Sequence, residues 1–195
     1  LSVNRIATWR NAAWFLLFDA SPFTGQFSHY HSGKNAPTLW YRGLPFLVDS
    51  GCCNYDLPDF AGWFKHSFAH SSLLVDGQSD GTLRGTYEWL AHAETKLSGW
   101  QNGVLTGALR SSVLAWHGVE WQRTLQTAAE GITLEDRVTA GKMHDYEFFF
   151  VLHPDVTVKL EEQKAILSNG QVKLHLRFDS ATPVKLNILP GKYCD

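Results

Sequence analysis

Short runs of apolar and β-branched residues recur along almost the whole chain, and turn-forming residues separate them. In residues 171–178 (QVKLHLRF), apolar side chains alternate with Lys173, His175 and Arg177, which is the period of a strand with one buried face. Comparable runs occupy residues 12–20, 38–43, 45–51, 71–77, 85–100, 103–110, 113–118, 120–126, 131–138, 145–154, 155–160, 164–170 and 184–189. Strands of this kind bury their apolar faces by forming antiparallel sheets that stack. The pattern predicts an all-β fold, a large antiparallel β-sandwich (super-sandwich) of about a dozen or more short strands.

Helix is expected to be scarce. No run of about 12 or more residues has the apolar spacing of an amphipathic helix. The longest stretch without alternation is residues 56–69 (DLPDFAGWFKHSFA), which predicts a loop with about one helical turn. Because long loops on rigid sheets often carry function, this segment is a candidate part of a site.

Length and charge narrow the class of protein. With 195 residues, of which 44% are hydrophobic, the chain predicts one domain over residues 1–195. The net charge is −2, and acidic and basic residues are interspersed along the chain. Neither a nucleic acid nor an anionic membrane is therefore an expected partner. The longest apolar run, in residues 145–154, is too short to span a bilayer, and residues 1–10 lack the apolar core of a signal peptide. We therefore expect a soluble domain, with any targeting peptide removed or outside this sequence.

The three cysteines show no recognisable pattern of a disulfide framework or a metal site. Cys52, Cys53 and Cys194 have no metal-ligand spacing, and adjacent cysteines rarely pair with each other. Cys52 and Cys53 are expected to be packing residues. The cysteine pattern alone leaves the redox compartment open.

Two histidines in residues 28–51 suggest a site. His29 and His31 are one residue apart, so in an extended strand their side chains share a face. Zinc prefers nitrogen, oxygen and sulfur ligands, and many of its sites combine imidazoles with a carboxylate. Candidate ligands are His31, Asp49 and a histidine from the end of the long loop, either His66 or His70. The competing interpretation is that these are surface or core histidines, because nine histidines give many accidental triples.

The order of several motifs provides a more specific indication. The chain has SHYH at 28–31, PFLVDSG at 45–51 followed by Tyr55, and AHSSLLVDGQ at 69–78. WQRTLQ, ITLEDRV and VLHP then follow at 121–126, 132–138 and 151–154. In this order the chain resembles the C-terminal β-domain of the heparinase II/III-like polysaccharide lyases. The resemblance covers nearly the whole chain and is strongest over residues 28–78.

The resemblance implies a role for each of four residues. The second histidine of the pair, the aspartate of the VDxG strand and the histidine of the AHN-like motif are zinc ligands in the family, and they correspond to His31, Asp49 and His70. The family's zinc is mainly structural. The first histidine, here His29, lies in the catalytic cleft of family members and helps to hold the substrate or its developing charge.

The sequence departs from the family pattern at four positions. Gly33 stands where the family often has an aspartate, Ser71 replaces the usual asparagine, and Lys65 stands where an arginine is common. His66 falls where the pattern has a small hydroxyl residue, which favours His70 as the ligand. These changes bear on substrate contacts more than on the fold.

The resemblance also implies an activity and its partners. Family members cleave acidic, uronate-containing glycans such as alginate or a glycosaminoglycan by β-elimination, and the catalytic tyrosine and a neutralising asparagine or histidine lie on an N-terminal helical domain. This chain is therefore expected to be the C-terminal part of a longer protein, inactive by itself, with an acidic polysaccharide or oligosaccharide and that helical domain as partners. The implied location is periplasmic or secreted.

Two aromatic residues near the expected site are candidate substrate contacts. Most of the eight tryptophans are expected in the core of a sheet protein, but Trp63 lies in the long loop, and Tyr55 precedes it closely. Both are predicted to bind substrate. The alternative function is a non-catalytic carbohydrate-binding or structural β-sandwich module in which the histidines are merely structural.

Overall fold

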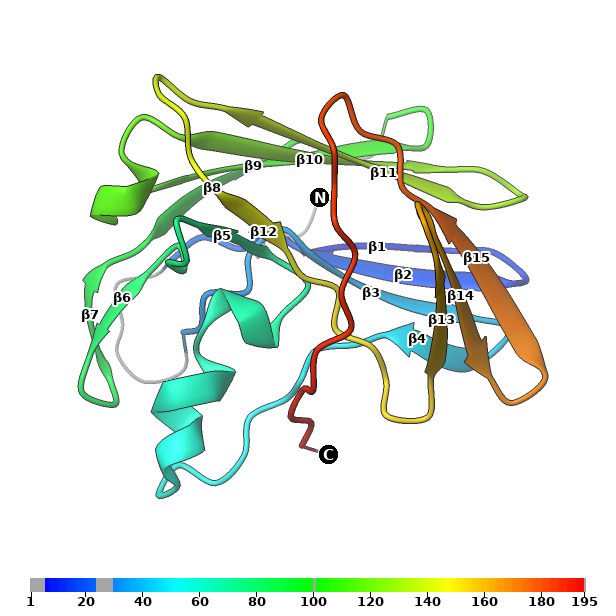
Figure 1. Ribbon diagram of the computed structural model, residues 1–195, viewed down its shortest axis with the longest axis horizontal. Coiled ribbons are helices and arrows are strands. Elements are labelled where there is room, and N and C mark those ends of the chain that lie inside the picture. The colour runs from blue at the N-terminus through cyan, green and yellow to red at the C-terminus, as the bar shows by residue number, and fades with distance from the viewer. Residues whose placement is uncertain (1–5, 24–29, 100, 195) are drawn as a thin grey trace.

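Strands dominate the computed structural model, which describes residues 6–23, 30–99 and 101–194 (Figure 1). The prediction of an all-β fold with little helix is confirmed. The described residues form three short helical elements, the π-helix η1 (Phe60–Phe64) and the 3₁₀ turns η2 (Ser67–Ala69) and η3 (Leu114–Trp116). The strands are β1 (Ile6–Arg10), β2 (Trp14–Asp19), β3 (Ala36–Tyr41), β4 (Leu44–Leu47), β5 (Leu73–Val75), β6 (Thr82–Arg84), β7 (Glu88–Ala91), β8 (Ala93–Leu97), β9 (Val104–Ser111), β10 (Glu120–Thr127), β11 (Ile132–Thr139), β12 (Tyr146–Phe148), β13 (Thr157–Glu161), β14 (Lys164–Asn169) and β15 (Val172–Arg177).

Two four-stranded antiparallel sheets form the sandwich. One has the order β1-β2-β3-β4 and the other β11-β10-β9-β8, and Figure 1 shows the second lying above the first. Leu16 and Phe18 of β2 point to one face because they are two residues apart, and they pack against Leu105 of β9 and Leu125 of β10. The alternation of β2 thus places its apolar face between the sheets.

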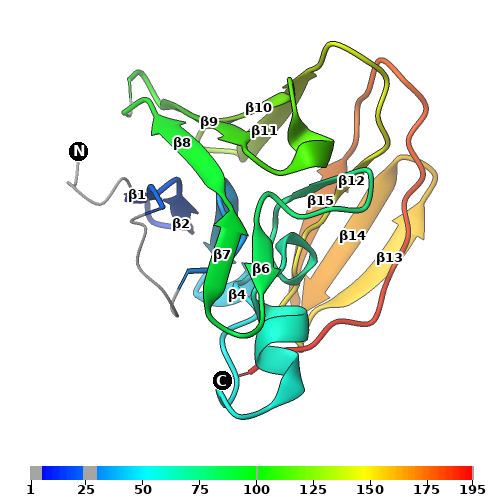
Figure 2. The same ribbon diagram turned by 90° about the vertical axis from the view of Figure 1, so that its left-hand side faces the viewer.

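A third sheet, β13-β14-β15, lies at one side of the first two (Figures 1 and 2). Its buried residues Leu167 and Leu174 pack with Trp14 of β2 and Phe46 of β4. The alternation predicted for residues 171–178 is confirmed, since Leu174 is buried whereas Lys173 and His175 on either side are exposed. This packing holds β4, which leads directly into Asp49.

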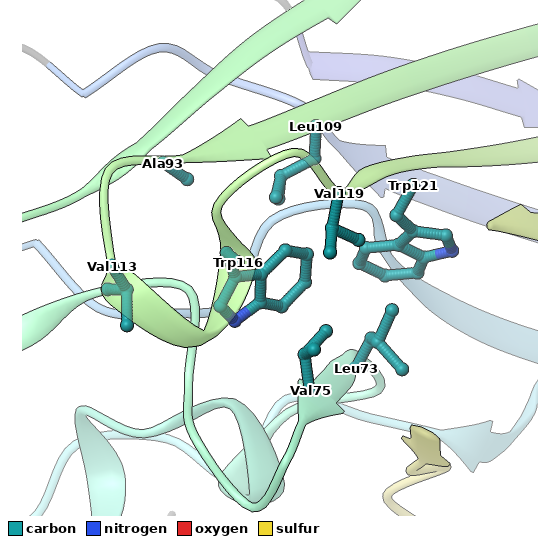
Figure 3. Close-up of a cluster of buried hydrophobic side chains, with 8 residues drawn as sticks. All are labelled: Leu73, Val75, Ala93, Leu109, Val113, Trp116, Val119 and Trp121. Atoms are coloured by element: carbon teal, nitrogen blue, oxygen red, sulfur yellow. The ribbon is translucent and has the colours of Figure 1, made fainter. Parts of the chain in front are cut away.

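A second core cluster anchors the short strand β5, which follows His70. Leu73 and Val75 of β5 contact Trp116 and Trp121 from the segment around η3 and β10, as Figure 3 shows. β5 also pairs antiparallel with β12. Burial of β5 against two tryptophans therefore fixes where the preceding histidine lies.

A buried arginine connects the second sheet to the loops of the site. Arg123 on β10 is 0% exposed, and its Nε and Nη2 donate to Asp136 on β11 at 2.8 and 2.9 Å. Its Nη1 donates to the backbone carbonyls of Ser71, at 2.6 Å, and Asn35, at 3.1 Å. A planar guanidinium can satisfy this many acceptors at once. Arg123 thus fastens the segments that follow His31 and His70 to the sheet.

Two predicted strands are wrong. Residues 113–118 form η3, which buries Trp116 in the core, and a short apolar run cannot distinguish such a turn from a strand. Residues 184–189 form no strand in the described part of the chain. Pro183 and Pro190 flank them and lack the N–H groups that a ladder needs. Residues 56–69 form no strand, as predicted, but they contain two short helical elements, η1 and η2, where about one helical turn was expected.

The cysteine prediction is wrong for Cys53. Cys53 forms a disulfide with Cys194, 141 residues away, with their Cα atoms 5.5 Å apart, whereas Cys52 is free and exposed. The backbone N–H of Cys194 also donates to the carbonyl of Ser50 at 3.0 Å. The sequence could not indicate this pairing, because only the fold brings the C-terminal segment to the loop after β4.

None of the helices among the described residues is long and apolar enough to cross a membrane.

Candidate metal centre

Three polar side chains converge between the end of β4 and the start of β5. His31, Asp49 and His70 each offer a ligand atom, and these atoms all lie within 4.8 Å of one another. Of the two histidines considered for the third position, the fold brings His70 to this point. His66 instead lies with its Nδ1 3.4 Å from the Ser79 hydroxyl.

Asp49 is positioned by the strand before it and the turn after it. Phe46 and Val48 are buried, and the N–H of Val48 donates to the carbonyl of Val151 at 3.0 Å, so the chain emerges from the core at Asp49. The Oδ1 of Asp49 accepts the N–H of Gly51 at 3.0 Å in a turn that Gly51 permits with φ +81°. Its Oδ2 is thereby left for the histidines.

His70 is held in one orientation. The residue is 1% exposed, its Nε2 lies 2.9 Å from the carbonyl oxygen of Phe64, and its Nδ1 lies 2.7 Å from the Asp49 Oδ2. A carbonyl can only accept, so Nε2 carries a proton, and in a neutral imidazole Nδ1 then presents a lone pair to a carboxylate. Two acceptors at this distance require a proton or a cation between them. This is the arrangement of a metal-ligating histidine whose other nitrogen is fixed by a backbone carbonyl.

His31 completes the group. Its ring centroid lies 4.2 Å from that of His70, and its buried Nδ1 has no hydrogen-bond partner among the described residues. Burial and the adjacent His70 lower the pKa of His31 to about 3. Burial raises the pKa of Asp49, but the neighbouring His70 and His31 together with the N–H of Gly51 outweigh it and lower the pKa to about 2. At neutral pH the site therefore offers a neutral imidazole and an ionised carboxylate, the forms that bind metals.

The donor set fits zinc. Two imidazole nitrogens and one carboxylate oxygen are common zinc ligands, and three protein ligands leave one tetrahedral position open. The unpartnered Nδ1 of His31 and the lone pair of His70 are the groups that such an ion would satisfy. The three residues that the sequence predicted as ligands thus lie together.

The structure explains the glycine at position 33, where the sequence departs from the family pattern. A Cβ at this position would lie 2.5 Å from the Nδ1 of His31 and 2.9 Å from the Cγ of His70. Any side chain here would push the two imidazoles away from their present positions.

Substitution of Gly33 by alanine is therefore expected to weaken zinc binding at least tenfold and to destabilise the protein by roughly 1–3 kcal/mol, as overpacking does. Zinc affinity is measured by competition with a chelator, and stability by urea unfolding. Gly141→Ala is the control, because a Cβ there meets nothing within 4 Å. Wild-type zinc affinity in Gly33→Ala would contradict this account of the site.

A small cavity of about 140 Å³ lies beside His31. Aromatic side chains dominate its wall, and one lysine contributes; among the lining residues are Tyr30, Tyr55, Phe60, Phe64 and Lys65. Tyr55, predicted as a substrate contact, is exposed and lines the cavity. Lys65 was not predicted as a site residue, although its place at a position where the family has arginine could have indicated it.

The other predicted site residues have different outcomes. Trp63 packs against Phe68 with 4.9 Å between ring centroids. The Nζ of Lys192 lies 5.5 Å from the centroid of the Trp63 ring, so Trp63 contacts the C-terminal segment. Trp63 is not among the residues that line the cavity. His29 lies outside the described residues. Its assignment as a catalytic residue stays a prediction.

The sequence matches the model of one protein family. The family is described as Heparinase II/III-like, C-terminal, and the match covers residues 5–195. A comparison with curated proteins found no match.

Several solved structures share the fold of this chain. A mutant of the heparan sulfate lyase HepC from Pedobacter heparinus superposes with a TM-score of 0.78 and 16% identity, over 98% of this chain and 30% of that one. The HepC structure from the same organism has a TM-score of 0.60 and 14% identity, over 84% of this chain and 27% of that one. A structure described as heparinase III, the BT4657 gene product, has a TM-score of 0.56 and 13% identity, over 85% of this chain and 27% of that one. At these identities the likeness establishes the fold, and the chain spans about 30% of the length of the first of these proteins.

Proposed function

Because this chain belongs to the heparinase II/III-like, C-terminal family, we propose that it is the zinc-binding β-domain of a polysaccharide lyase that cleaves acidic, uronate-containing glycans by β-elimination. The observation that carries the proposal is the convergence of His31, Asp49 and His70, with the Nδ1 of His70 facing a carboxylate oxygen at 2.7 Å. Structural neighbours described as a heparan sulfate lyase and heparinase III favour a glycosaminoglycan as the substrate. Alginate is the second candidate.

The three ligands are assigned a structural role. Zinc, when bound, supplies a cross-link between the segments before β3, after β4 and before β5. The rings of His31 and His70 fix the orientation of their segments, and the Asp49 carboxylate would neutralise part of the charge of the zinc ion. Because His29 is only two residues before His31 in the sequence, we assign to the fixed His31 a part in positioning the proposed catalytic histidine.

The reaction needs more groups than this domain is proposed to supply. A base must remove the proton next to the carboxylate, an acid must protonate the departing oxygen, and the carboxylate must be neutralised as charge develops. We assign His29 to one wall of the cleft, where it holds the substrate or its developing charge, and Tyr55 to substrate binding. The tyrosine that transfers protons is assigned to an N-terminal helical domain of a longer protein, in line with the 30% coverage of the first solved neighbour.

The proposed location is the periplasm or the cell exterior. The Cys53–Cys194 disulfide supports it, because structural disulfides persist mainly in oxidising compartments.

The test is an assay of the longer protein against a panel of polysaccharides, with detection of the ultraviolet absorbance of unsaturated uronates. The panel contains heparan sulfate, other glycosaminoglycans, alginate, and carboxyl-reduced versions as controls. We expect unsaturated product from at least one uronate polymer and none from its carboxyl-reduced form. Binding of these polymers without any unsaturated product would favour the alternative, a carbohydrate-binding module.

A further inference from the structure

The C-terminal segment, residues 179–194, crosses the molecule and reaches the candidate metal centre. It contains no helix or strand, and most of its side chains are exposed. Figure 1 shows it, in red, running from β15 to the loop that follows β4. There Cys194 forms the disulfide with Cys53, and its backbone N–H donates to the carbonyl of Ser50 at 3.0 Å. A covalent bond and a hydrogen bond thus fasten the segment to the residues that directly follow Asp49.

The C-terminal segment lies against the turn that orients the Asp49 carboxylate. In this turn the Oδ1 of Asp49 accepts the N–H of Gly51 at 3.0 Å, and the Oδ2 lies 2.7 Å from the Nδ1 of His70. The carbonyl oxygen of Cys194 packs so closely on Gly51 that a Cβ there would collide with it. The carbonyl of Ser50, in the middle of the turn, accepts the Cys194 N–H. Displacement of the segment would therefore free the turn that directs Oδ2.

The same segment contacts the loop that holds His70. The Nζ of Lys192 lies 2.5 Å from the Oδ1 of Asp59 and 5.5 Å from the centroid of the Trp63 ring. Asp59 immediately precedes η1, and Trp63 belongs to it. Phe64, the last residue of η1, supplies the carbonyl that accepts the Nε2 proton of His70 at 2.9 Å. The C-terminal segment thus contacts the chain beside two of the three proposed zinc ligands.

The disulfide is the strongest of these attachments. The side chains of Lys192 and Asp59 are about half exposed, and ion pairs of this kind contribute little to stability. A single hydrogen bond such as that from Cys194 to Ser50 is also a modest contribution. A disulfide contributes more than either. Without it, the exposed C-terminal segment would have only weak contacts to keep it against the turn.

We propose that the Cys53–Cys194 disulfide is a clasp that positions Asp49 and the loop of His70 for zinc. This inference rests on the proposed function, because it concerns the same zinc site. With the disulfide closed, the carboxylate and the imidazole are ordered before the ion arrives. With the disulfide open, they must be ordered when zinc binds, and this cost lowers the affinity. Cys53 and Cys194 are therefore positioning residues and do not themselves ligate the ion.

The zinc affinity of Cys53→Ser/Cys194→Ser tests the clasp, because serine removes the disulfide without leaving thiols that could bind zinc. Affinity is measured by competition with a chromophoric chelator, well below the melting temperature. We expect zinc to bind about tenfold or more weakly, the size seen when groups that orient metal ligands are replaced. The near-ultraviolet circular dichroism of the folded protein should be retained.

Two control variants are expected to keep wild-type zinc affinity. Cys52→Ser removes the free thiol of the same loop and leaves the disulfide intact. Leu105→Ala removes buried side-chain atoms from the core between the two large sheets, so it destabilises the protein without touching the clasp. The comparison separates a local effect on the ligands from a general loss of stability.

A second measurement starts from the folded, zinc-loaded protein, in case the double variant does not fold. Cys52 is first alkylated with iodoacetamide, from which its thiolate displaces iodide. A phosphine then breaks the S–S bond of Cys53–Cys194. Water supplies the oxygen of the phosphine oxide and the two protons of the new thiols, which are alkylated in turn. We expect a chelator to remove zinc about tenfold faster from this protein than from protein alkylated at Cys52 alone.

Four results would overturn the clasp and leave the proposed function standing. They are wild-type zinc affinity in the double variant, an equal loss of affinity in Leu105→Ala, unchanged zinc release after reduction, and loss of the near-ultraviolet signal when the zinc-loaded protein is reduced. The last would mean that the disulfide holds the whole fold and not the ligands in particular. A wild-type protein with an intact disulfide that binds no zinc would instead count against the proposed function.

Discussion

Replacement of His70 by alanine is expected to lower the melting temperature of the zinc-loaded protein by roughly 10 °C or more. The imidazole is buried, its Nε2 donates to the carbonyl of Phe64, and its Nδ1, 2.7 Å from the Oδ2 of Asp49, is the zinc ligand in our proposal. Its loss removes the binding free energy of the ion and leaves buried acceptors unpaired. A cost of about 3–5 kcal/mol is expected, and each kcal/mol corresponds to about 2–4 °C in a domain of this size.

The matched control is His66→Ala, since His66 comes from the same loop but its Nδ1 lies 3.4 Å from the Ser79 hydroxyl and not at the centre. A chelator should lower the melting temperature of the wild type and of His66→Ala, but should change His70→Ala little. For the same reason His31→Ala should destabilise the protein more than His29→Ala does. Equal losses in all these variants, with no effect of the chelator, would mean that zinc does not contribute to folding.

The second large effect concerns catalysis. Residues 1–195 alone are expected to have no measurable lyase activity, whereas activity of the longer protein should fall by roughly 10² or more on His29→Ala, as expected for loss of one acid–base or charge-stabilising group. Groups that act as one constellation are strongly non-additive, so a domain with part of the constellation loses nearly all of the rate enhancement. Initial rates of unsaturated uronate formation provide the measurement.

A specific outcome would contradict the two-domain account. If residues 1–195 released unsaturated products at a rate near that of the longer protein, a tyrosine of this domain would have to transfer the proton. Burial and the nearby Asp80 carboxylate raise the pKa of Tyr30, which makes it a poor base. Tyr55, which is exposed and lines the cavity next to His31, would then be the residue to replace by phenylalanine.

Local patterns predicted most of the fold because many of the strands bury one face. Residues 171–178 show this directly, since Leu174 meets the core and its neighbours Lys173 and His175 meet the solvent as expected. The pattern failed where runs of apolar residues do not pair as strands. Trp116 fills the core from a 3₁₀ turn, and the segment between Pro183 and Pro190 lacks a strand.

The candidate site was predictable only in part. His31, Asp49 and His70 belong to motifs with a fixed order, so the resemblance identified them although nine histidines are present. Contacts between distant segments had no such signal. The Cys53–Cys194 disulfide, the four hydrogen bonds described for Arg123 and the aromatic rings around Lys65 depend on how the sheets pack, which local periodicity does not encode.

Metal analysis of the purified protein tests the central claim most directly. After saturation with zinc and removal of the excess, we predict about one zinc ion per wild-type chain and less than about 0.2 in His31→Ala and Asp49→Ala, with His66→Ala as the control that keeps its zinc. A folded wild-type protein that retains no zinc, or variants of the three ligands that retain as much as the wild type, would contradict the assignment of His31, Asp49 and His70 as a zinc site.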